Sequence, residues 1–138
     1  MKAANQYSIL FVDDEPWLSE PLRMSLEGMG YNCISTKNAT EALRVLESEY
    51  IDVMITDIMM DGGDLFEDVD SQEMGFELIE RIRKRWPDQP IICLSVIGDV
   101  DRILSLKRKN ILYLRKGETP LDTAIKLIES KATGRIQF

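Results

Sequence analysis

Two kinds of hydrophobic pattern alternate along this chain. Five short runs rich in Ile, Leu, Val and Phe resemble strands that are buried on both faces of a sheet. They cover residues 7–12, 31–36, 51–57, 91–95 and 111–114. Between them apolar residues recur every three or four positions, which predicts helices near residues 19–29, 38–46, 75–86, 100–109 and 120–128. This alternation predicts a parallel sheet with helices on both faces and right-handed crossovers.

Capping residues support several of these boundaries. Asn38 and Glu41 match a capping box at the start of the second helix. Thr119 and the proline after it predict an N-cap and a first helical residue for the last helix. Ser19 is a candidate N-cap for the first helix, because a proline two residues later fits poorly inside a helix; a kink is the alternative.

Length and composition fit one domain over residues 1–138. The chain is 44% hydrophobic and 30% charged, which suits a single core. No apolar run approaches the roughly 20 residues that span a bilayer, and residues 1–6 lack the apolar centre of a signal peptide. Cys33 and Cys93 lie far apart, as buried thiols of a reducing compartment do. We therefore expect a cytoplasmic protein with no membrane segment.

The negative charge is concentrated in one segment. The net charge is −7, and residues 61–74 contain six acidic residues and no basic one: Asp61, Asp64, Glu67, Asp68, Asp70 and Glu73. The rest of the chain is almost neutral, which gives no support for nucleic-acid binding. The segment has no periodicity, so it is interpreted as an inserted loop. It is either disordered and solvated, or a lid or partner-recognition element. The domain core is expected over residues 7–130, with a flexible tail over 131–138.

Polar groups stand at the ends of the predicted strands. Asp13 and Asp14 follow the first strand, Asp57 ends the third, Ser95 ends the fourth and Lys116 follows the fifth. In open α/β sheets, ligands bind at the edge where the carboxyl ends of the strands meet. Clustered carboxylates need a cation, and the absence of histidine argues against zinc and favours Mg²⁺. A carboxylate can accept a phosphoryl group if metal, ammonium and hydroxyl donors neutralise the developing charge. The alternative is that these groups are ordinary caps.

On these residues the chain resembles the receiver domain of two-component response regulators. The matching pieces are Val12 to Pro16, Asp57 to Met60, Gly75, Ser95 after an apolar strand, and Tyr113 to Lys116. The resemblance implies a flavodoxin-like, doubly wound α/β fold with five parallel strands in the order 2-1-3-4-5. It also implies Mg²⁺ as cofactor, a histidine kinase or phosphotransfer protein as phosphoryl donor, and a downstream effector protein or domain as partner.

The resemblance also gives the acidic residues their roles. Asp57 is the phosphoacceptor and a metal ligand. Asp14 binds the metal directly, Asp13 binds it largely through water, and the Met59 backbone carbonyl is a further ligand.

Three other residues are implied to act on the phosphoryl group or to respond to it. Lys116 and Ser95 contact the phosphoryl oxygens, and Tyr113 moves inward when Ser95 is drawn to the phosphate. The face formed by the fourth helix, the fifth strand and the fifth helix is expected to shift, and it is the expected surface for a homodimer.

The chain departs from the family pattern at several positions. Asp61 and Gly117 stand where proline is usual, Val96 stands where a small residue is usual, and the loop over 61–74 is longer. Without proline a cis bond before Gly117 would cost about 2.5–4 kcal/mol, so a trans bond or a rearranged loop is expected. Val96 is interpreted as a possible obstacle to the phosphoryl group or to the movement of Tyr113.

The apolar residues Met59 and Ile97, two positions beyond Asp57 and Ser95, lead to a hypothesis about lifetime. If they flank the phosphoryl group they cannot orient a water molecule, so autodephosphorylation should be slow.

The leading interpretation is a phosphorylation-controlled switch rather than a turnover enzyme. The runner-up is a receiver-like protein-binding module that does not use phosphorylation. Val96, Gly117 and the loop over 61–74 favour it, whereas the complete set of polar residues at the strand ends opposes it. A Mg²⁺-dependent phosphatase with an aspartate nucleophile would carry a second aspartate where Met59 stands. A flavin protein of this fold would carry a Ser/Thr/Gly-rich loop after the first strand, and none follows it.

Overall fold

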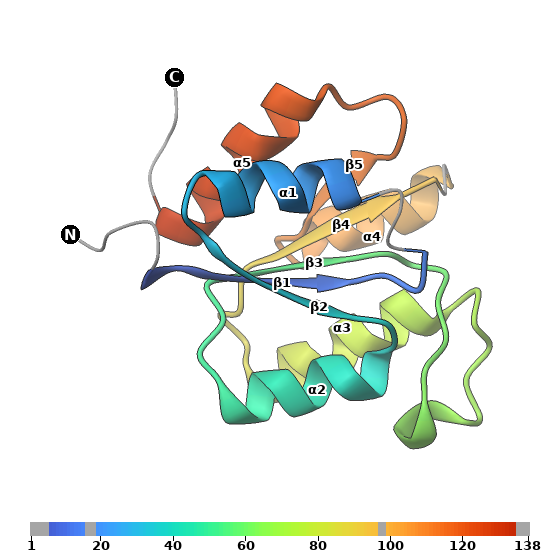
Figure 1. Cartoon of the computed structure of the whole chain (residues 1–138). Coiled ribbons are helices and arrows are strands. Elements are labelled where there is room, and N and C mark those ends of the chain that lie inside the picture. The colour runs from blue at the N-terminus through green and yellow to red at the C-terminus, as the bar shows by residue number, and fades with distance from the viewer. Residues whose placement is uncertain (1–5, 16–18, 97–98, 135–138) are drawn as a thin grey trace.

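A computed structural model describes residues 6–15, 19–96 and 99–134 of the chain. Its strands are β1 (Ser8–Val12), β2 (Asn32–Thr36), β3 (Val53–Thr56), β4 (Ile91–Ser95) and β5 (Leu112–Arg115). Its helices are α1 (Glu20–Gly28), α2 (Ala39–Ser48), the 3-10 helix η3 (Asp64–Phe66), α3 (Met74–Arg85), α4 (Val100–Arg108) and α5 (Leu121–Thr133). Strand and helix alternate along the described chain as the hydrophobic pattern predicts (Figure 1).

The five strands form one parallel sheet in the order β2-β1-β3-β4-β5, which confirms the predicted topology. Val12, the last residue of β1, is in register with Thr36 at the end of β2 and with Thr56 at the end of β3. Ser95 at the end of β4 is in register with Arg115 at the end of β5. The carboxyl ends of the strands are therefore level, and the residues that follow them share one edge of the sheet.

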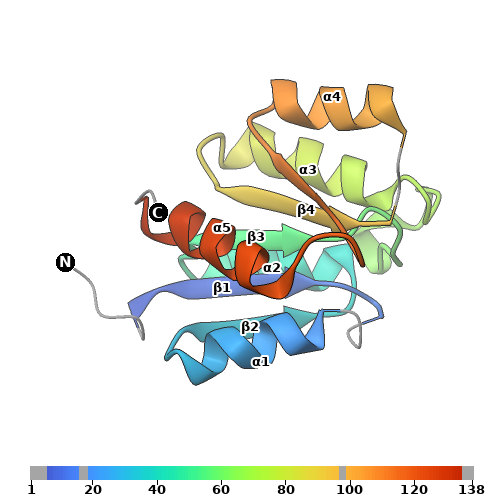
Figure 2. The same ribbon diagram turned by 90° about the horizontal axis from the view of Figure 1, so that it is seen from above.

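Two layers of helices cover the sheet, α1 and α5 on one face and α2, α3 and α4 on the other (Figures 1 and 2). Successive residues of a strand point to opposite faces. In β1, Ile9 and Phe11 accordingly pack with α1 and α5, whereas Leu10 and Val12 pack with α2 and α3. Both faces exclude water, so the central strands read as continuous apolar runs in the sequence.

The helix caps bear out two of the three sequence predictions. Ser19 is the N-cap residue of α1, without a side-chain capping bond. The Asn38 side chain accepts a hydrogen bond from the Glu41 backbone N–H at 2.9 Å and begins α2. The prediction for the last helix is wrong by one residue, because Pro120 is the N-cap of α5. The Thr119 hydroxyl instead donates to the Arg115 carbonyl at 3.1 Å, closing the turn after β5.

Both cysteines are free thiols. Cys93 is buried in β4, as predicted, and burial raises the pKa of its thiol. Cys33 is half-buried in β2, where burial is the main cause that raises the pKa of its thiol to about 11. Neither thiol is therefore in the reactive thiolate form near neutral pH.

The acidic segment 61–74 is anchored to the core, which rules out the interpretation of a wholly solvated loop. Phe66 of η3 is 3% exposed and belongs to the core cluster beneath α2 and α3. The guanidinium of Arg81 on α3 lies 4.4 Å from the centre of the Phe66 ring. The backbone N–H of Thr40, in the first turn of α2, donates to the Gly62 carbonyl at 2.9 Å. The segment therefore satisfies helix N–H groups that would otherwise lack partners.

The prediction of a flexible tail over residues 131–138 is wrong for its first three residues. Residues 131–133 continue α5, which ends at Gly134 in the left-handed conformation that glycine favours. Residues 135–138 lie outside the described chain. None of the described helices has the length and hydrophobicity that crossing a membrane requires.

Candidate functional site

Two aspartates and one lysine form a buried ionic group at the carboxyl edge of the sheet. The Lys116 ammonium donates to Asp57 Oδ2 at 2.7 Å and to Asp13 Oδ2 at 3.0 Å. The side chains of Lys116, Asp13 and Asp57 are 5%, 6% and 13% exposed. Asp13 and Asp57 reach this point because each directly follows one of two strands that end level with each other. The structure thus brings together three residues that are far apart in the sequence.

The surrounding backbone fixes both carboxylates. Asp57 Oδ1 accepts a hydrogen bond from the Ile58 backbone N–H at 2.6 Å, and Asp13 Oδ1 accepts one from the Glu15 backbone N–H at 2.8 Å. Burial alone would lower the pKa of Lys116, but its hydrogen bonds to Asp57 and Asp13 and their charges outweigh burial and raise that pKa. The ammonium is therefore held in its charged form between two anions.

Asp14 lies on the open side of this group. Its side chain is exposed, and it lines a cleft of about 310 Å³ together with Glu15, Asp57 and Lys116. Burial is the main cause that raises the pKa of Asp14, and the nearby charges of Asp13 and Asp57 raise it further. A hydrogen bond from the Asp61 backbone N–H acts in the opposite direction. The three predicted acidic residues are thus close enough to interact electrostatically.

These acidic groups are not arranged as a ready-made metal site. No group of three acidic, cysteine or histidine side chains in the described chain is placed to hold a metal ion. The expected convergence of Asp13, Asp14 and Asp57 on one ion is therefore not found in this structure, in which the single Lys116 ammonium lies between Asp13 and Asp57. The donors themselves are all oxygen atoms, which suits a hard cation such as Mg²⁺.

Ser95 and Tyr113 lie beside the ionic group but do not open into the cleft. Ser95 is fully buried, and it is not among the described residues that line the cleft. Its carbonyl accepts hydrogen bonds from the Tyr113 hydroxyl at 3.2 Å and from the Lys116 backbone N–H at 2.9 Å. Burial is the main cause that raises the pKa of the half-buried Tyr113. The end of β4 thus links the aromatic residue to the lysine through one backbone oxygen.

The remaining predicted positions frame the opening of the cleft. Met59 and Val96 line it and are 43% and 57% exposed. Ile97 lies outside the described residues. No peptide bond in the described chain is cis, as expected for the bond before Gly117, and Gly117 has a φ of +79°. This left-handed conformation is one that proline cannot adopt.

The sequence motif includes Gly75 but does not show why this position must be glycine. Its N–H donates to the Ile58 carbonyl at 2.7 Å, at the start of α3. A Cβ atom at this position would overlap the Asp57 carbonyl oxygen and the Ile58 Cα. Only glycine lets the start of α3 approach the backbone of Asp57 and Ile58 this closely. Ser71, in contrast, is a residue that sequence reasoning did not single out: it belongs to the acidic segment and lines the cleft.

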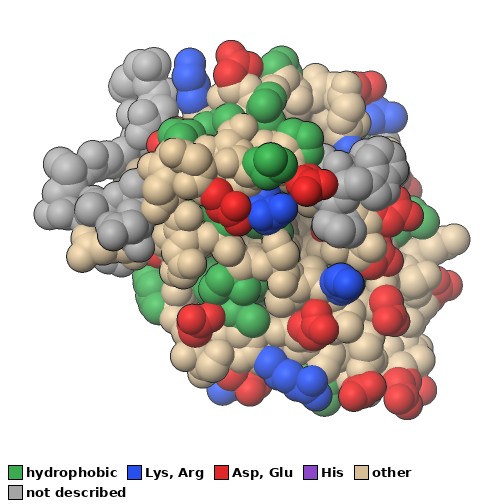
Figure 3. Space-filling view, in the orientation of Figure 1, with side chains coloured by type: hydrophobic (Ala, Val, Ile, Leu, Met, Phe, Trp, Pro, Cys, Tyr) green, Lys and Arg blue, Asp and Glu red, His purple; other side chains and the backbone are tan. Residues whose placement is uncertain are grey.

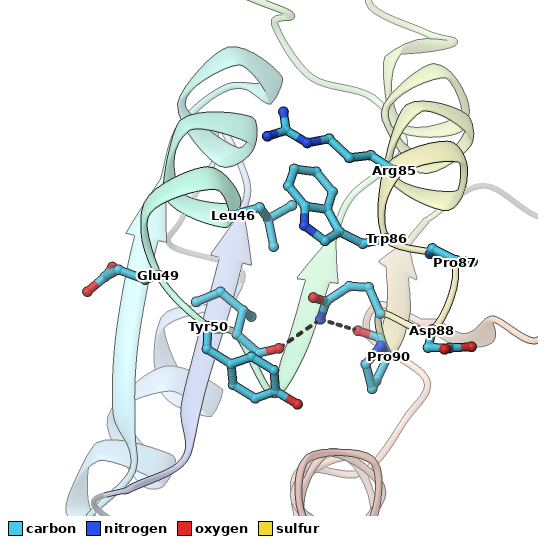
Figure 4. Close-up of a pocket in the computed structure, with 10 residues that line it drawn as sticks. Leu46, Glu49, Tyr50, Arg85, Trp86, Pro87, Asp88 and Pro90 are labelled. Carbon is cyan, nitrogen blue, oxygen red and sulfur yellow. Dashed lines mark hydrogen bonds between the residues drawn. The ribbon is translucent and has the colours of Figure 1, made fainter.

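A second pocket, of about 330 Å³, lies at the opposite edge of the sheet, between the ends of α2 and α3 (Figure 4). Figure 4 shows Trp86 and Tyr50 on its walls, and the Gln89 amide donates to the carbonyls of Ile51 and Pro90. It lies at the amino ends of β3 and β4, where ligands of such sheets do not usually bind. The cleft at Asp57 is therefore the candidate site.

The insertion over residues 61–74 exposes a concentration of negative charge. All six acidic residues of the segment 61–74 are exposed, and acidic side chains gather where this segment covers the surface in Figure 3. Only Glu73 among them is in an ion pair, with Arg102 of α4, within the described chain. The surface of this segment is thus strongly negative, and the cleft is lined by three acids, Asp14, Glu15 and Asp57, and by one base, Lys116.

Comparison with known proteins agrees with this geometry. The family model of the response regulator receiver domain matches residues 9–120. The transcriptional regulatory protein GlrR of Escherichia coli K12 is 31% identical over 109 residues, which are 78% of this chain and 22% of GlrR. The DNA-binding transcriptional regulator NtrC of the same organism is 29% identical over 118 residues, covering 86% of this chain and 23% of NtrC. The chain thus spans about a fifth of the length of these relatives.

A solved structure with a related sequence shares the fold. The response regulator TrrA of Thermotoga maritima, described as a complex with Mg²⁺ and BeF, is 30% identical with a TM-score of 0.72. The match covers 91% of this chain and 98% of TrrA. With the predicted strand order, the level strand ends and the family model in agreement, the chain belongs to the receiver domains of two-component response regulators.

Proposed function

We propose that Asp57 accepts a phosphoryl group from a histidine kinase or a phosphotransfer protein, and that the domain acts as a switch rather than as a turnover enzyme. The contact of 2.7 Å between Asp57 and Lys116 carries this proposal. Lys116 holds the Asp57 carboxylate in place, so one of its oxygens can attack phosphorus. The same ammonium would neutralise charge on the transferred phosphoryl oxygens.

We further propose Mg²⁺ as the cofactor. The carboxylates of Asp13, Asp14 and Asp57 and the Met59 backbone carbonyl would hold it, and Mg²⁺ so bound neutralises phosphoryl oxygens. Lys116 would then release Asp13 and keep its contact with Asp57. The oxygen donors and the mutual influence of Asp13, Asp14 and Asp57 support this set. TrrA, described with Mg²⁺ and BeF, gives it family support.

The switch would operate through the end of β4. Attraction of the Ser95 hydroxyl to the phosphoryl group would move the carbonyl that now accepts hydrogen bonds from Tyr113 and from the Lys116 backbone. Tyr113 would turn inward, and the face formed by α4, β5 and α5 would shift between two populations. An effector protein or domain, or a second copy of this chain, would read that change.

We propose a cytoplasmic location, which the two free thiols support. We also propose that residues 61–74 are an insertion in a single receiver domain with its core over residues 7–130.

Phosphorylation of the purified protein tests the assignment of Asp57. With acetyl phosphate and Mg²⁺, mass spectrometry should find one added phosphoryl group, located on Asp57. Asp57→Asn should not be modified, whereas Asp64→Asn, which changes an exposed acid of the insertion, should be modified like wild type. Modification at another residue, or equal modification of Asp57→Asn, would contradict the proposal.

A second candidate function is a protein-binding module that does not use phosphorylation. The exposed Val96 side chain at the cleft and the left-handed conformation of Gly117, which a proline could not adopt, favour it. Beryllofluoride with Mg²⁺ discriminates between the two: a switch binds it and changes the amide spectra of α4 and β5, whereas a phosphorylation-independent module shows neither effect.

A further inference from the structure

Ser71 is a hydroxyl that the insertion brings to the acceptor cleft. It lines the cleft that Asp57 and Lys116 also line, and its side chain is exposed at the solvent boundary. It lies fourteen positions after Asp57 in the sequence, so only the fold of the insertion makes the two residues neighbours in one cleft.

The backbone holds Ser71 in this place. Its carbonyl accepts hydrogen bonds from the Met60 N–H at 3.0 Å and from the Met74 N–H at 3.4 Å. Met60 and Met74 are at most 1% exposed and belong to the core cluster. The Gln72 backbone N–H donates to Asp70 Oδ1 at 2.9 Å, which closes a turn around Ser71. Ser71 therefore sits on a segment fixed from both ends, although its own side chain faces water.

The other residues that line the cleft indicate what the Ser71 hydroxyl can do there. Among the described residues that line the cleft, the neutral side chains other than Ser71 are apolar, those of Met59, Met60 and Val96. Of the charged ones, Asp57 and Lys116 bind each other, and Asp14 and Glu15 are acids that repel an anion. Ser95, which the family resemblance makes a phosphoryl ligand, is fully buried. Ser71 is thus the neutral polar group that can hold a water molecule at the mouth of the cleft.

On the basis of the proposed function, we propose that Ser71 is a positioning residue that sets the lifetime of the phosphoryl group on Asp57 by orienting the hydrolytic water. The oxygen of that water attacks phosphorus, and the bond between phosphorus and the Asp57 oxygen breaks. The carboxylate leaves with the bonding electrons. Inorganic phosphate keeps one proton of the water, and the other passes to solvent. A neutral hydroxyl orients the water without taking its proton, so its effect is modest.

The decay of phosphorylated protein tests this role. Wild type is phosphorylated with acetyl phosphate and Mg²⁺, the reagent is removed, and the phosphorylated fraction is followed by intact-protein mass spectrometry. Ser71→Ala should lengthen the lifetime about threefold to tenfold. Ser71→Thr retains the hydroxyl and should stay within about twofold of wild type. Ser48→Ala removes an exposed hydroxyl at the end of α2 and should not change the lifetime.

Beryllofluoride affinity separates orientation of water from binding of the phosphoryl group. Ser71→Ala should retain that affinity within about twofold, because the phosphoryl ligands are unchanged. An unchanged or shorter lifetime in Ser71→Ala would overturn the inference, and so would a parallel loss of beryllofluoride affinity. If wild type takes up no phosphoryl group, the proposed function itself fails, and the first step of the experiment shows this separately.

Discussion

The same kind of side chain behaves in two ways in two neighbouring regions of this protein. At the candidate site, Asp13 is buried, Asp57 is 13% exposed, and the two share one ammonium at 3.0 and 2.7 Å. In the insertion 61–74 all six acids are exposed, and the segment is held by the apolar side chain of Phe66. Charged groups that are buried and paired form a reactive site. Exposed charged groups contribute only a screened electrostatic potential. The number of acids in a segment is therefore a poor guide to where the chemistry is.

Removal of the apolar anchor should have the largest effect. Phe66→Ala should lower the free energy of unfolding by about 3–5 kcal/mol, because it leaves a cavity in the core. Urea denaturation measures this loss. The neighbouring Leu65 is 51% exposed, so Leu65→Ala should cost no more than about 0.5 kcal/mol. Equal losses in the two variants would show that the insertion is not anchored through Phe66.

Removal of the ammonium should have the next largest effect. Lys116→Met leaves two buried carboxylates without a cation, and unfolding in the absence of Mg²⁺ should become easier by about 2–4 kcal/mol. Millimolar Mg²⁺ should restore part of the loss, because the carboxylates can then share the metal. Lys84→Met changes an exposed lysine on α3 and should be nearly neutral. A Lys116→Met protein as stable as wild type, with or without Mg²⁺, would remove the distinction between the two regions.

The negative electrostatic potential of the insertion should have a smaller effect, on the affinity for Mg²⁺. Glu67→Gln combined with Asp68→Asn should weaken Mg²⁺ binding by about twofold at low ionic strength, because two negative charges of the insertion are lost. The difference should vanish at high salt. The matched control, Glu49→Gln with Asp122→Asn, removes two exposed acids from other parts of the surface. Calorimetric titration with Mg²⁺ compares them, and an unchanged affinity at low salt would reject the role of the insertion.

The ion pair between the insertion and α4 should contribute least to stability. Glu73 and Arg102 are both about half exposed, and the Arg102 guanidinium also lies 4.0 Å from the centre of the Phe76 ring. Glu73→Gln should lower the free energy of unfolding by at most about 1 kcal/mol. Glu80→Gln breaks an exposed ion pair with Lys109, and its loss of unfolding free energy is the reference for comparison. A loss several times larger than in Glu80→Gln would mean that the pair is part of the anchor.

The sequence was informative where one periodicity dominated. Residues 91–95 were predicted as a strand and form β4 with the same bounds, because five consecutive apolar or small residues buried on both faces leave no other interpretation. The capping box at Asn38 and Glu41 was found for the same reason, since its hydrogen bonds are local. The N-cap at Thr119 was misplaced by one residue, because its hydroxyl had a competing acceptor in the preceding turn, the Arg115 carbonyl.

The sequence failed where contacts depend on residues far away. The composition of 61–74 predicted a solvated loop or a lid, and nothing local showed that Phe66 enters the core beside Arg81. Gly75 was recognised as a motif residue, but its close approach to the Asp57 backbone appeared only in the structure. Ser71 went unnoticed for the same reason.

The sequence by itself determined the order of strands and helices, the parallel sheet and the set of polar residues at its edge, because these follow from local periodicity and from the rules of connection. Only the tertiary structure decided how those polar groups pair. It placed the Lys116 ammonium between Asp13 and Asp57, buried Ser95 and brought Ser71 to the cleft. Pairing depends on distances of a few ångströms between residues that are far apart in the chain, and sequence patterns carry no such distances.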